Sequence, residues 1–435
     1  MKVPLVTLFP KPGFKRYTAS SGLLRHRLYH YSHSPPPASS PPPFLLSTIQ
    51  KHTTSQPSFP AFAHRQHPAF TTTRAASMKA LVYQSKGTVG IEERPQPTIQ
   101  SPTDAIVKVK HTTICGTDLH IIKGDVATAT PGRVLGHEGV GVVQEVGSSV
   151  QGFAAGDTVL ISCITACGAC PFCRKEMSSH CVSGGWILGN TIDGTQAEYV
   201  RVPHAASSLY KLPDTVDLPS AVMLSDALPT GLECGTLNGK VKPGSTVAII
   251  GAGAVGMSVM MTSMLYSPSL LVMVDLDDGR LAMAKRFGAH ETVNSKGGKE
   301  AVEKLLKMTD GQGFDAVIEA VGIPQTFQMC QELVAPGGII ANVGVHGTKV
   351  ELYMDKLWDR NICITTRLVD AVTTPMLLKL FQAGRLDTSK LATHSYMDGK
   401  EFQAEIVAAA SAQDSHSANA RRHIRYSAPR QITTL

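Results

Sequence analysis

The chain has 435 residues, of which 43% are hydrophobic and 17% are charged. This length exceeds what one hydrophobic core usually supports, so we expect two globular domains and an additional segment. The sequence contains no uncharged apolar run of about 18 residues, the length that a membrane-spanning helix requires, so we predict no membrane span. Subtracting the nine Lys and Arg of residues 1–77 from the 41 in the chain leaves 32 basic against 34 acidic residues, which argues against a nucleic-acid partner.

Residues 1–77 are rich in Ser, Thr and Pro and contain no Asp or Glu. A basic, hydroxyl-rich and acid-free composition is typical of a mitochondrial transit peptide, and Phe14 to Tyr31 alternates leucines with basic residues, as its amphipathic part would. A disordered extension or a start site placed too early is the alternative, because Met78 opens a strand. The first interpretation places the protein in the mitochondrial matrix, and translation from Met78 would place it in the cytoplasm.

Short β-runs separated by glycines follow the leader. Their alternation of apolar and polar residues predicts a barrel-like β domain. A helical pattern then extends from Ala221 to Asn238. The expected strands are Lys79–Tyr83, Ala105–His111, Gly139–Val146, Thr158–Ser162 and Ala197–Val202.

Five of the nine cysteines lie between Cys163 and Cys181. In this group Cys167, Cys170, Cys173 and Cys181 are separated by two, two and seven residues, and four thiolates so close can enclose one zinc ion tetrahedrally, as in a structural site. An iron–sulfur cluster and free core cysteines are the alternatives. The segment is polar and broken by Gly and Pro, which is unlike a core, and the rest of the chain is unlike a ferredoxin. We therefore predict a structural zinc, with Cys163 as a bystander.

From Ser245 onward strands and helices alternate, which predicts a doubly wound parallel sheet. The expected strands of this sheet are Thr246–Ile250, Leu270–Val274, Phe314–Glu319, Gly338–Val343 and Ile362–Thr366.

A glycine motif follows the first strand of that sheet and opens a helix. Gly251, Gly253 and Gly256 would permit a tight turn, close approach of the backbone to a pyrophosphate and close packing of the helix. Asp275 ends the next strand, where a carboxylate would bind the ribose hydroxyls and repel a 2′-phosphate, so we predict NAD rather than NADP. The alternative for Asp275 is an ordinary turn carboxylate. Arg280 is expected to support the ribose.

Polar residues of three further segments are the candidates for catalysis. These segments are Cys115 to His120, Gly136 to Glu138, and Ser225 with Asp226. Taken singly, they have ordinary explanations as a buried thiol, a core histidine and a helix cap. Together they resemble the zinc-dependent medium-chain alcohol dehydrogenases, from Met78 to about Ser395, and are most similar to the microbial short-chain and secondary alcohol enzymes, in which an Asp replaces a more familiar Cys ligand.

The resemblance implies a set of metal ligands. Cys115, His137 and Asp226 would hold a catalytic zinc, with Glu138 beside it as an alternate or outer ligand. Asp118 would orient His137 through its other ring nitrogen. Three protein ligands leave a fourth position for water or substrate.

The resemblance also implies the chemistry. The metal would lower the pKa of a bound short-chain primary or secondary alcohol, and hydride would pass to C4 of the nicotinamide. The proton would leave through a hydroxyl at Thr117, the cofactor ribose and His120. Trp186 would either line the substrate cleft or simply pack. The expected cofactors are NAD and two zinc ions per chain, and the expected neighbours of the cofactor include Thr230, Val255 and Val343.

The domain organisation follows from the same resemblance. We expect an α/β protein with a GroES-like β-rich catalytic domain over residues 78–227, including the cysteine lobe 163–181, and a Rossmann domain over residues 228–367. Residues 368–435 should return to the catalytic domain, and the protein should form a homodimer or homotetramer. The end of the chain departs from the family, because after a helix beginning at Lys400 the sequence from Ser411 onward shows no β-run. We expect the closing strand to be missing and a sheet edge to be unpaired.

Two rival functions fit parts of the sequence. A zinc-free quinone or enoyl reductase would share the glycine motif but would have no use for Cys115, His137 or the four clustered cysteines. A catalytically inactive nucleotide-binding protein would fit the altered C-terminal segment. The first rival predicts well under one zinc per chain, and the second predicts NADH binding without alcohol oxidation.

Overall fold

The computed structural model of the protein describes residues 76–389, 391, 394–396, 401, 403–404, 406–408 and 424–427. The chain divides into two compact units, residues 1–71 and residues 72–435, and the described residues all belong to the second. The predicted leader lies outside the described residues. Within the described part of the chain, no helix has both the length and the apolar character needed to cross a bilayer.

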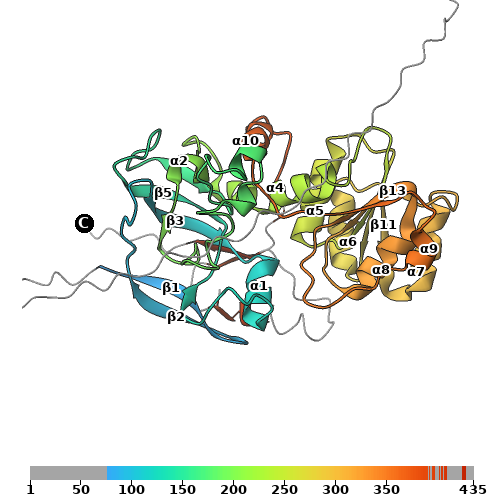
Figure 1. Cartoon of the computed structure of the whole chain (residues 1–435), viewed down its shortest axis with the longest axis horizontal. Coiled ribbons are helices and arrows are strands. Elements are labelled where there is room, and N and C mark those ends of the chain that lie inside the picture. Colours follow the sequence, from blue (N-terminus) through green and yellow to red (C-terminus); the bar gives the residue numbers. More distant parts are fainter. Residues whose placement is uncertain are drawn as a thin grey trace, which may run out of the picture. The chain divides into compact units, whose positions relative to one another are not determined.

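The predicted β-rich part is present and consists of two sheets, in which all strand pairs except β15 with β16 are antiparallel (Figure 1). Val107, Val109, Val159 and Ile161 are buried in one apolar cluster because side chains alternate between the two faces of a strand. The smaller sheet has the order β2 (Thr88–Pro95), β1 (Ser77–Ser85), β4 (Arg133–Val134). The larger has the order β15 (His394–Tyr396), β16 (Ile424–Ser427), β3 (Ala105–Thr113), β5 (Gly139–Val146), β6 (Thr158–Ile161), β8 (Leu209–Lys211), and β7 (Tyr199–Val202) also pairs with β3.

The prediction that the closing strand is missing is wrong. Strand β16 pairs antiparallel with the last residues of β3, from His111 to Thr113, and parallel with β15. The expected preceding helix is present, since the described residues between 401 and 408 are helical. The strand escaped the sequence analysis because it is only four residues long, and the exposed backbone groups of β3 can pair with a partner of almost any side-chain pattern.

A six-stranded parallel sheet forms the second part, as the alternation of elements predicted. The chain runs outward from β9 in one direction, then returns and continues from β12 in the other. The carboxyl ends of β9 and β12 therefore border the crevice in which such sheets bind ligands. The order is β11 (Glu291–Asn294), β10 (Leu270–Asp275), β9 (Thr246–Ile250), β12 (Phe314–Glu319), β13 (Val334–Asn342), β14 (Cys363–Thr366).

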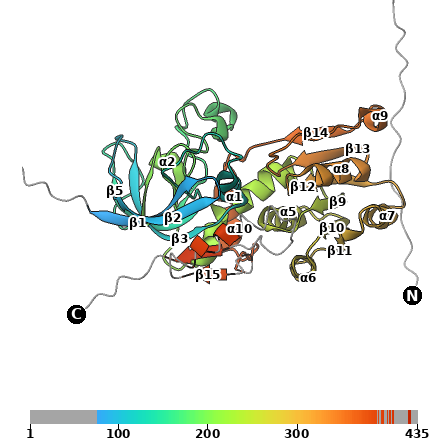
Figure 2. The same cartoon turned by 90° about the horizontal axis from the view of Figure 1, so that it is seen from below.

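Helices cover this sheet, and shorter helices accompany the β-rich part (Figures 1 and 2). Those that accompany the parallel sheet are α5 (Ala254–Met264), α6 (Asp278–Arg286), α7 (Lys299–Lys307), α8 (Pro324–Leu333), α9 (Met354–Leu357) and η5 (Ser295–Gly297). The others are α1 (Gly116–Lys123), η1 (Cys173–Lys175), η2 (Ser178–His180), α2 (Ala205–Ser208), α3 (Leu218–Ala221), η3 (Val222–Leu224), α4 (Ala227–Thr230), the π-helix η4 (Gly231–Leu237) and α10 (Thr374–Gln382).

The predicted helical stretch Ala221–Asn238 is largely helical, but it is divided between the end of α3, η3, α4 and η4, with a turn at Ser225 and Asp226. Two glycines allow its end to lie directly against α5. A Cβ atom on Gly231 would lie 2.6 Å from the carbonyl carbon of Ser258, and one on Gly235 would lie 2.5 Å from Cγ2 of Val259. The backbones approach closely only because both positions lack a side chain.

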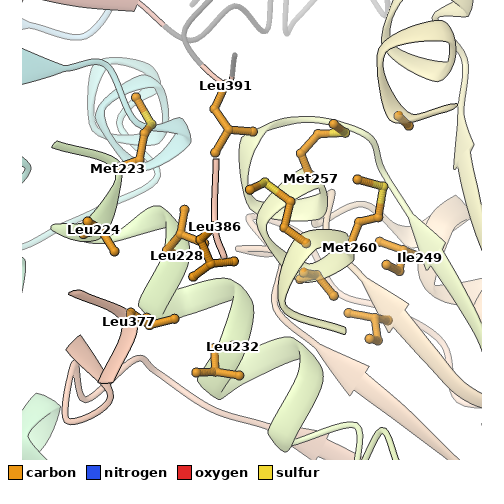
Figure 3. Packing of buried hydrophobic residues seen from close by; sticks show 14 of the residues in the cluster. Met223, Leu224, Leu228, Leu232, Ile249, Met257, Met260, Leu377, Leu386 and Leu391 are labelled. Atoms are coloured by element: carbon orange, nitrogen blue, oxygen red, sulfur yellow. The ribbon is translucent and has the colours of Figure 1, made fainter. Parts of the chain in front are cut away.

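The largest apolar cluster is built on this contact (Figure 3). Leu228 and Leu232 are four residues apart, so they lie on one face of the helical stretch and pack in the same cluster as Met257 and Met260 of α5. Leu377 of α10 joins them from the C-terminal part of the chain. This cluster holds the residues that follow Asp226 next to the parallel sheet.

We expect Leu228→Ala to destabilise the protein by about 2–5 kcal/mol, because it would leave a cavity at a side chain that has no exposed surface. Leu237→Ala is the matched control, because Leu237 ends the same helical stretch but is 40% exposed. The measurement is the melting temperature followed by circular dichroism. Equal melting temperatures for the two variants would contradict this account of the core.

Candidate metal centres and dinucleotide pocket

The structure brings together three of the predicted ligands from distant segments. The backbone amide of Cys115, at the start of α1, donates to Oδ2 of Asp118 at 2.8 Å, which fixes the residue that carries the thiol. Asp226 precedes α4, and His137 is buried in the segment before β5. One potential ligand atom from each of Cys115, His137 and Asp226 lies within 4.8 Å of the other two.

The separations of these atoms fit a zinc ion. Nε2 of His137 is 3.4 Å and Sγ of Cys115 is 3.7 Å from Oδ2 of Asp226. Around a tetrahedral zinc with ordinary bond lengths, nitrogen and oxygen ligands lie about 3.3 Å apart and sulfur and oxygen ligands about 3.6 Å apart. The thiolate, imidazole and carboxylate are also ligand types that zinc accepts. The residues present therefore fit the metal.

The electrostatics of this cluster favour a cation. Burial, the largest effect, raises the pKa of Cys115 to about 11, although His137 lowers it. Burial lowers the pKa of His137, but its hydrogen bonds to Asp226 and Cys115 outweigh this and raise that pKa well above the ordinary value. Burial likewise raises the pKa of Asp226, and the bond to His137 turns the balance to a lowered pKa. A bound divalent cation would replace the proton that these side chains share.

Asp118 lies beside His137 but does not hydrogen-bond to it in this structure. Its Oδ1 is 4.0 Å from Nδ1 of His137, which is too long for a hydrogen bond. Its Oδ2 accepts from the Cys115 amide and, at 3.0 Å, from Nε2 of Gln196. The sequence analysis did not identify Gln196, which also donates to the carbonyl of Thr113.

Glu138 is buried, but the group of close ligand atoms found in the described chain contains only the other three residues. Burial, followed by the charge of Asp226, raises the pKa of Glu138 to about 8. Its backbone carbonyl accepts from the hydroxyls of Thr112 and Thr195, both at 2.7 Å. Glu138 therefore lies outside the group of three close ligands, where the sequence analysis expected an outer ligand.

The two residues predicted to carry the proton both line the pocket. The hydroxyl oxygen of Thr117 is 3.7 Å from Sγ of Cys115. Nδ1 of His120 is 2.9 Å from Oδ2 of Asp125, a residue that the sequence analysis missed because it lies beyond the end of α1.

The four clustered cysteines also converge, with ligand atoms within 4.8 Å of one another. Backbone amides point at their sulfurs. Sγ of Cys167 accepts from Ala169 at 3.5 Å and from Cys170 at 3.4 Å, and Sγ of Cys170 accepts from Cys173 at 3.4 Å. The amide of Cys173, followed by that of Val182, lowers the pKa of Cys170 to about 6. Such amides stabilise thiolates, the form that binds a metal.

Cys163 is not one of the four converging cysteines, as predicted, but it has a place that the sequence did not indicate. It is buried and lines the pocket. Burial raises the pKa of its thiol well above the ordinary value, and the nearby Asp226 adds to this. Cys234 lines the pocket as well.

The predicted glycine motif connects β9 to α5. Gly251 has a φ of +109°, which favours glycine, and a Cβ on Gly256 would lie only 1.9 Å from the carbonyl oxygen of Gly251. Around Gly253 a Cβ would meet nothing within 4 Å. The turn is therefore tight on its inner side and open at Gly253, where the backbone can approach a ligand.

Asp275 supports this turn. Its Oδ2 accepts from the amide of Ala252 at 2.7 Å, and its Oδ1 accepts from the amide of Asp277 at 2.9 Å. Nη1 of Arg280 lies 3.7 Å from the same Oδ1, as an ion pair. The carboxylate thus lies at the carboxyl end of β10 beside the glycine motif, where the sequence analysis expected it.

One pocket of about 230 Å³ connects the three-residue centre with the glycine motif. Trp186 is in its lining, with its ring edge-on to His137 at 6.2 Å between ring centres. Much of the remaining lining is apolar, which suits a small uncharged organic molecule. The predicted neighbours of the cofactor in this lining are Thr230, Gly253, Val255 and Val343, and the apolar wall includes Ile114, Leu119, Val126, Ile164, Leu368 and Val369.

Known protein families match both the β-rich part and the parallel-sheet part of this chain. The alcohol dehydrogenase GroES-like domain matches residues 101–214, and the zinc-binding dehydrogenase family matches residues 254–382. An alcohol dehydrogenase of Cupriavidus necator is 33% identical over 348 residues, covering 74% of this chain and 92% of that protein. The NADP-dependent isopropanol dehydrogenase of Clostridium beijerinckii is 32% identical, covering 73% and 92%. The apo form of zinc dependent alcohol dehydrogenase 2 from Streptococcus pneumonia is 48% identical, with a TM-score of 0.75, covering 82% and 100%.

We expect Cys170→Ser to lower the zinc content of the purified protein by about one ion per chain, because it removes a ligand from a closed four-thiolate site. Cys363→Ser is the control, since Cys363 is exposed and lies on β14, outside the cysteine lobe. Zinc is quantified by atomic emission after dialysis. An unchanged zinc content in Cys170→Ser would show that these cysteines do not hold the metal.

Proposed function

Because the chain belongs to the family of zinc-dependent medium-chain alcohol dehydrogenases, we propose that it transfers hydride between a short-chain primary or secondary alcohol and NAD. Its relatives identify it as an alcohol oxidoreductase. The assignment of a zinc-dependent reaction with a short-chain alcohol and NAD rests on one observation. A thiol, an imidazole and a carboxylate from three distant segments converge at a pocket that extends to the glycine motif. A zinc-free reductase of the same fold would have no use for that convergence.

Cys115, His137 and Asp226 would hold the zinc and leave one coordination position toward the pocket for the hydroxyl of the alcohol. Zinc bound there acts as a Lewis acid and lowers the pKa of that hydroxyl. The apolar wall would bind the alkyl part of the substrate and exclude water from the space between the alcohol and the nicotinamide. A wall of this kind favours small alcohols but discriminates weakly between them, since one methylene changes binding by about 1–3 kcal/mol.

The proton of the alcohol needs a path out of this pocket. We assign its acceptance to the Thr117 hydroxyl, which lies beside Cys115, and its release to His120. If Nδ1 of His120 donates to Asp125, Nε2 carries no proton and is free to accept one. Asp125 then fixes the tautomer in which His120 can work as a base.

The cofactor assignment depends on Asp275. Its carboxylate lies beside the glycine motif, and a 2′-phosphate on the adenosine ribose would meet its negative charge. The neighbouring Arg280 compensates part of that charge. The relative from Clostridium beijerinckii is NADP-dependent, so the preference of this chain needs its own measurement.

Other features of the proposal come from the sequence. The cysteine lobe would hold a second, structural zinc, which makes two zinc ions per chain. Glu138 would act as an alternate or outer ligand of the first. A homo-oligomeric state and a mitochondrial location with a cleaved leader are further parts of the proposal.

We expect the zinc-loaded protein to reduce NAD with short primary or secondary alcohols, and Asp226→Asn to lower kcat/KM by about 100-fold or more. Even the residues that support metal ligands typically contribute about 10- to 100-fold, so a ligand should contribute at least as much. Asp217→Asn is the matched control, because Asp217 also precedes a short helix but caps α3 through Ser220. Zinc-loaded protein that oxidises no alcohol in a broad panel would refute the proposal.

We expect Asp275→Gly to lower the ratio of kcat/KM for NAD to that for NADP by about tenfold or more, because one lost repulsion of about 1.4 kcal/mol corresponds to a factor of ten. Asp275→Asn is the companion variant, since it removes the charge but keeps an oxygen for the amide of Ala252. Steady-state rates with both cofactors measure the ratio. An unchanged ratio in both variants would refute the role of Asp275.

A further inference from the structure

A buried carboxylate joins the cysteine lobe to the wall of the pocket. Oδ1 of Asp370 accepts from both the amide and the hydroxyl of Ser179, at 3.0 and 2.6 Å, across 191 positions of the sequence. Ser179 is in η2, between the third and fourth cysteines of the lobe. Asp370 is 5% exposed and Ser179 is 9% exposed, so these bonds are shielded from water.

The other oxygen of Asp370 holds a residue of the pocket. Oδ2 accepts from Nη2 of Arg367 at 2.8 Å. Arg367, Leu368 and Val369 all line the pocket, directly before Asp370. Val369 packs in one apolar cluster with Ile164, which lies near the start of the cysteine lobe. One carboxylate therefore bonds to the lobe with one oxygen and to the pocket wall with the other.

Glu233 fixes the same turn from the opposite direction. Its carboxylate accepts from the amides of Asp370, Ala371 and Thr373 at 2.8, 3.2 and 2.9 Å, and from the Thr373 hydroxyl at 2.8 Å. Glu233 is in η4, three residues after Thr230 of the pocket. Ala371 has a φ of +57°, a left-handed conformation that an alanine rarely adopts, so the turn depends on such bonds to keep its shape.

We propose that Asp370 is a positioning residue, through which the four-cysteine lobe sets the position of the pocket wall at Arg367 to Val369. When the lobe is folded around its metal, Ser179 is fixed, Asp370 is fixed by Ser179, and the wall is fixed by Asp370. The lobe then contributes to the binding of alcohol and cofactor as well as to stability. The inference rests on the proposed function, because it takes the lobe as a metal site and the pocket as the place of hydride transfer.

The test compares Ser179→Ala with the unchanged holoenzyme at equal zinc content. This variant removes the hydroxyl bond to Asp370 and leaves the pair between Asp370 and Arg367 intact. We expect the KM for the alcohol and the dissociation constant for NADH each to rise about five- to tenfold, the lower part of the range typical of coupled sites. The kcat should change less than the KM, because the hydroxyl that is removed bonds to Asp370, which is neither a proposed metal ligand nor part of the proposed proton path. Fluorescence of NADH on titration measures the dissociation constant independently of turnover.

Asp370→Asn provides a second route to the same answer if Ser179→Ala loses its lobe metal. Asp370→Asn should raise the KM for the alcohol and the NADH dissociation constant by the same factor. In the double variant with Ser179→Ala, the fold-increase should be smaller than the product of the two single fold-increases, because both substitutions break the same connection. Asp315→Asn is the matched control. Oδ2 of Asp315 likewise accepts from an amide and a hydroxyl of one residue, Thr246, at 2.8 and 3.1 Å, but it does so at the opposite end of the parallel sheet from the pocket.

Each outcome decides one question. If Ser179→Ala and Asp370→Asn lower the melting temperature as Asp315→Asn does but leave the KM and the NADH dissociation constant unchanged, the connection is merely structural and the inference is overturned. If the unchanged holoenzyme oxidises no alcohol, the proposed function fails. In that case the NADH titrations of the same variants still decide whether Asp370 positions the wall.

Discussion

The direct contact between η4 and α5 is the constraint on which the site depends. Gly231 and Gly235 remove the side chains that would separate the two backbones. Asp226 and Thr230 precede this contact on the same helical stretch, and Gly253 and Val255 lie at the start of α5. The contact therefore places a proposed metal ligand and the opening of the glycine motif on one pocket. Without this contact, the metal centre and the glycine motif would not share one pocket.

Two of the three proposed metal ligands lie at the starts of helices. Cys115 and Asp226 both directly precede helices, and Asp118 closes the first turn of α1 back onto the Cys115 amide. At such positions the backbone direction is set by the helix, so the side chain is held without belonging to the helix itself. His137 needs a different support, because it lies in an irregular segment, and the buried side chains around it provide this. The centre is therefore positioned largely by backbone geometry before any metal binds.

Local sequence patterns predicted the elements well and their long-range partners poorly. The strands Gly139–Val146, Thr246–Ile250 and Phe314–Glu319 lie where the apolar runs predicted them, because a buried strand needs a continuous or alternating apolar run. The three proposed ligands came together as the resemblance implied. No local pattern indicated Gln196, because its side-chain bond to Asp118 joins residues 78 positions apart. The same holds for Asp370, and β16 was missed because a strand of four residues is too short to stand out as a β-run.

Two buried acids on the same helical stretch show why only one of them suits a metal. Glu233 receives four hydrogen bonds from backbone amides and a hydroxyl, which compensate its charge within the protein. Asp226 receives one from the Thr230 hydroxyl, and its other oxygen faces the Cys115 thiol and the His137 imidazole, which can donate to it only while they carry their protons. A buried carboxylate whose remaining donors are a thiol and an imidazole needs a positive charge nearby, and either their protons or a metal ion can supply it. The kind of donor around each carboxylate thus separates the two acids: fixed amides and a hydroxyl surround the acid that holds a turn, and side chains that can themselves bind a metal surround the acid that can hold a zinc ion.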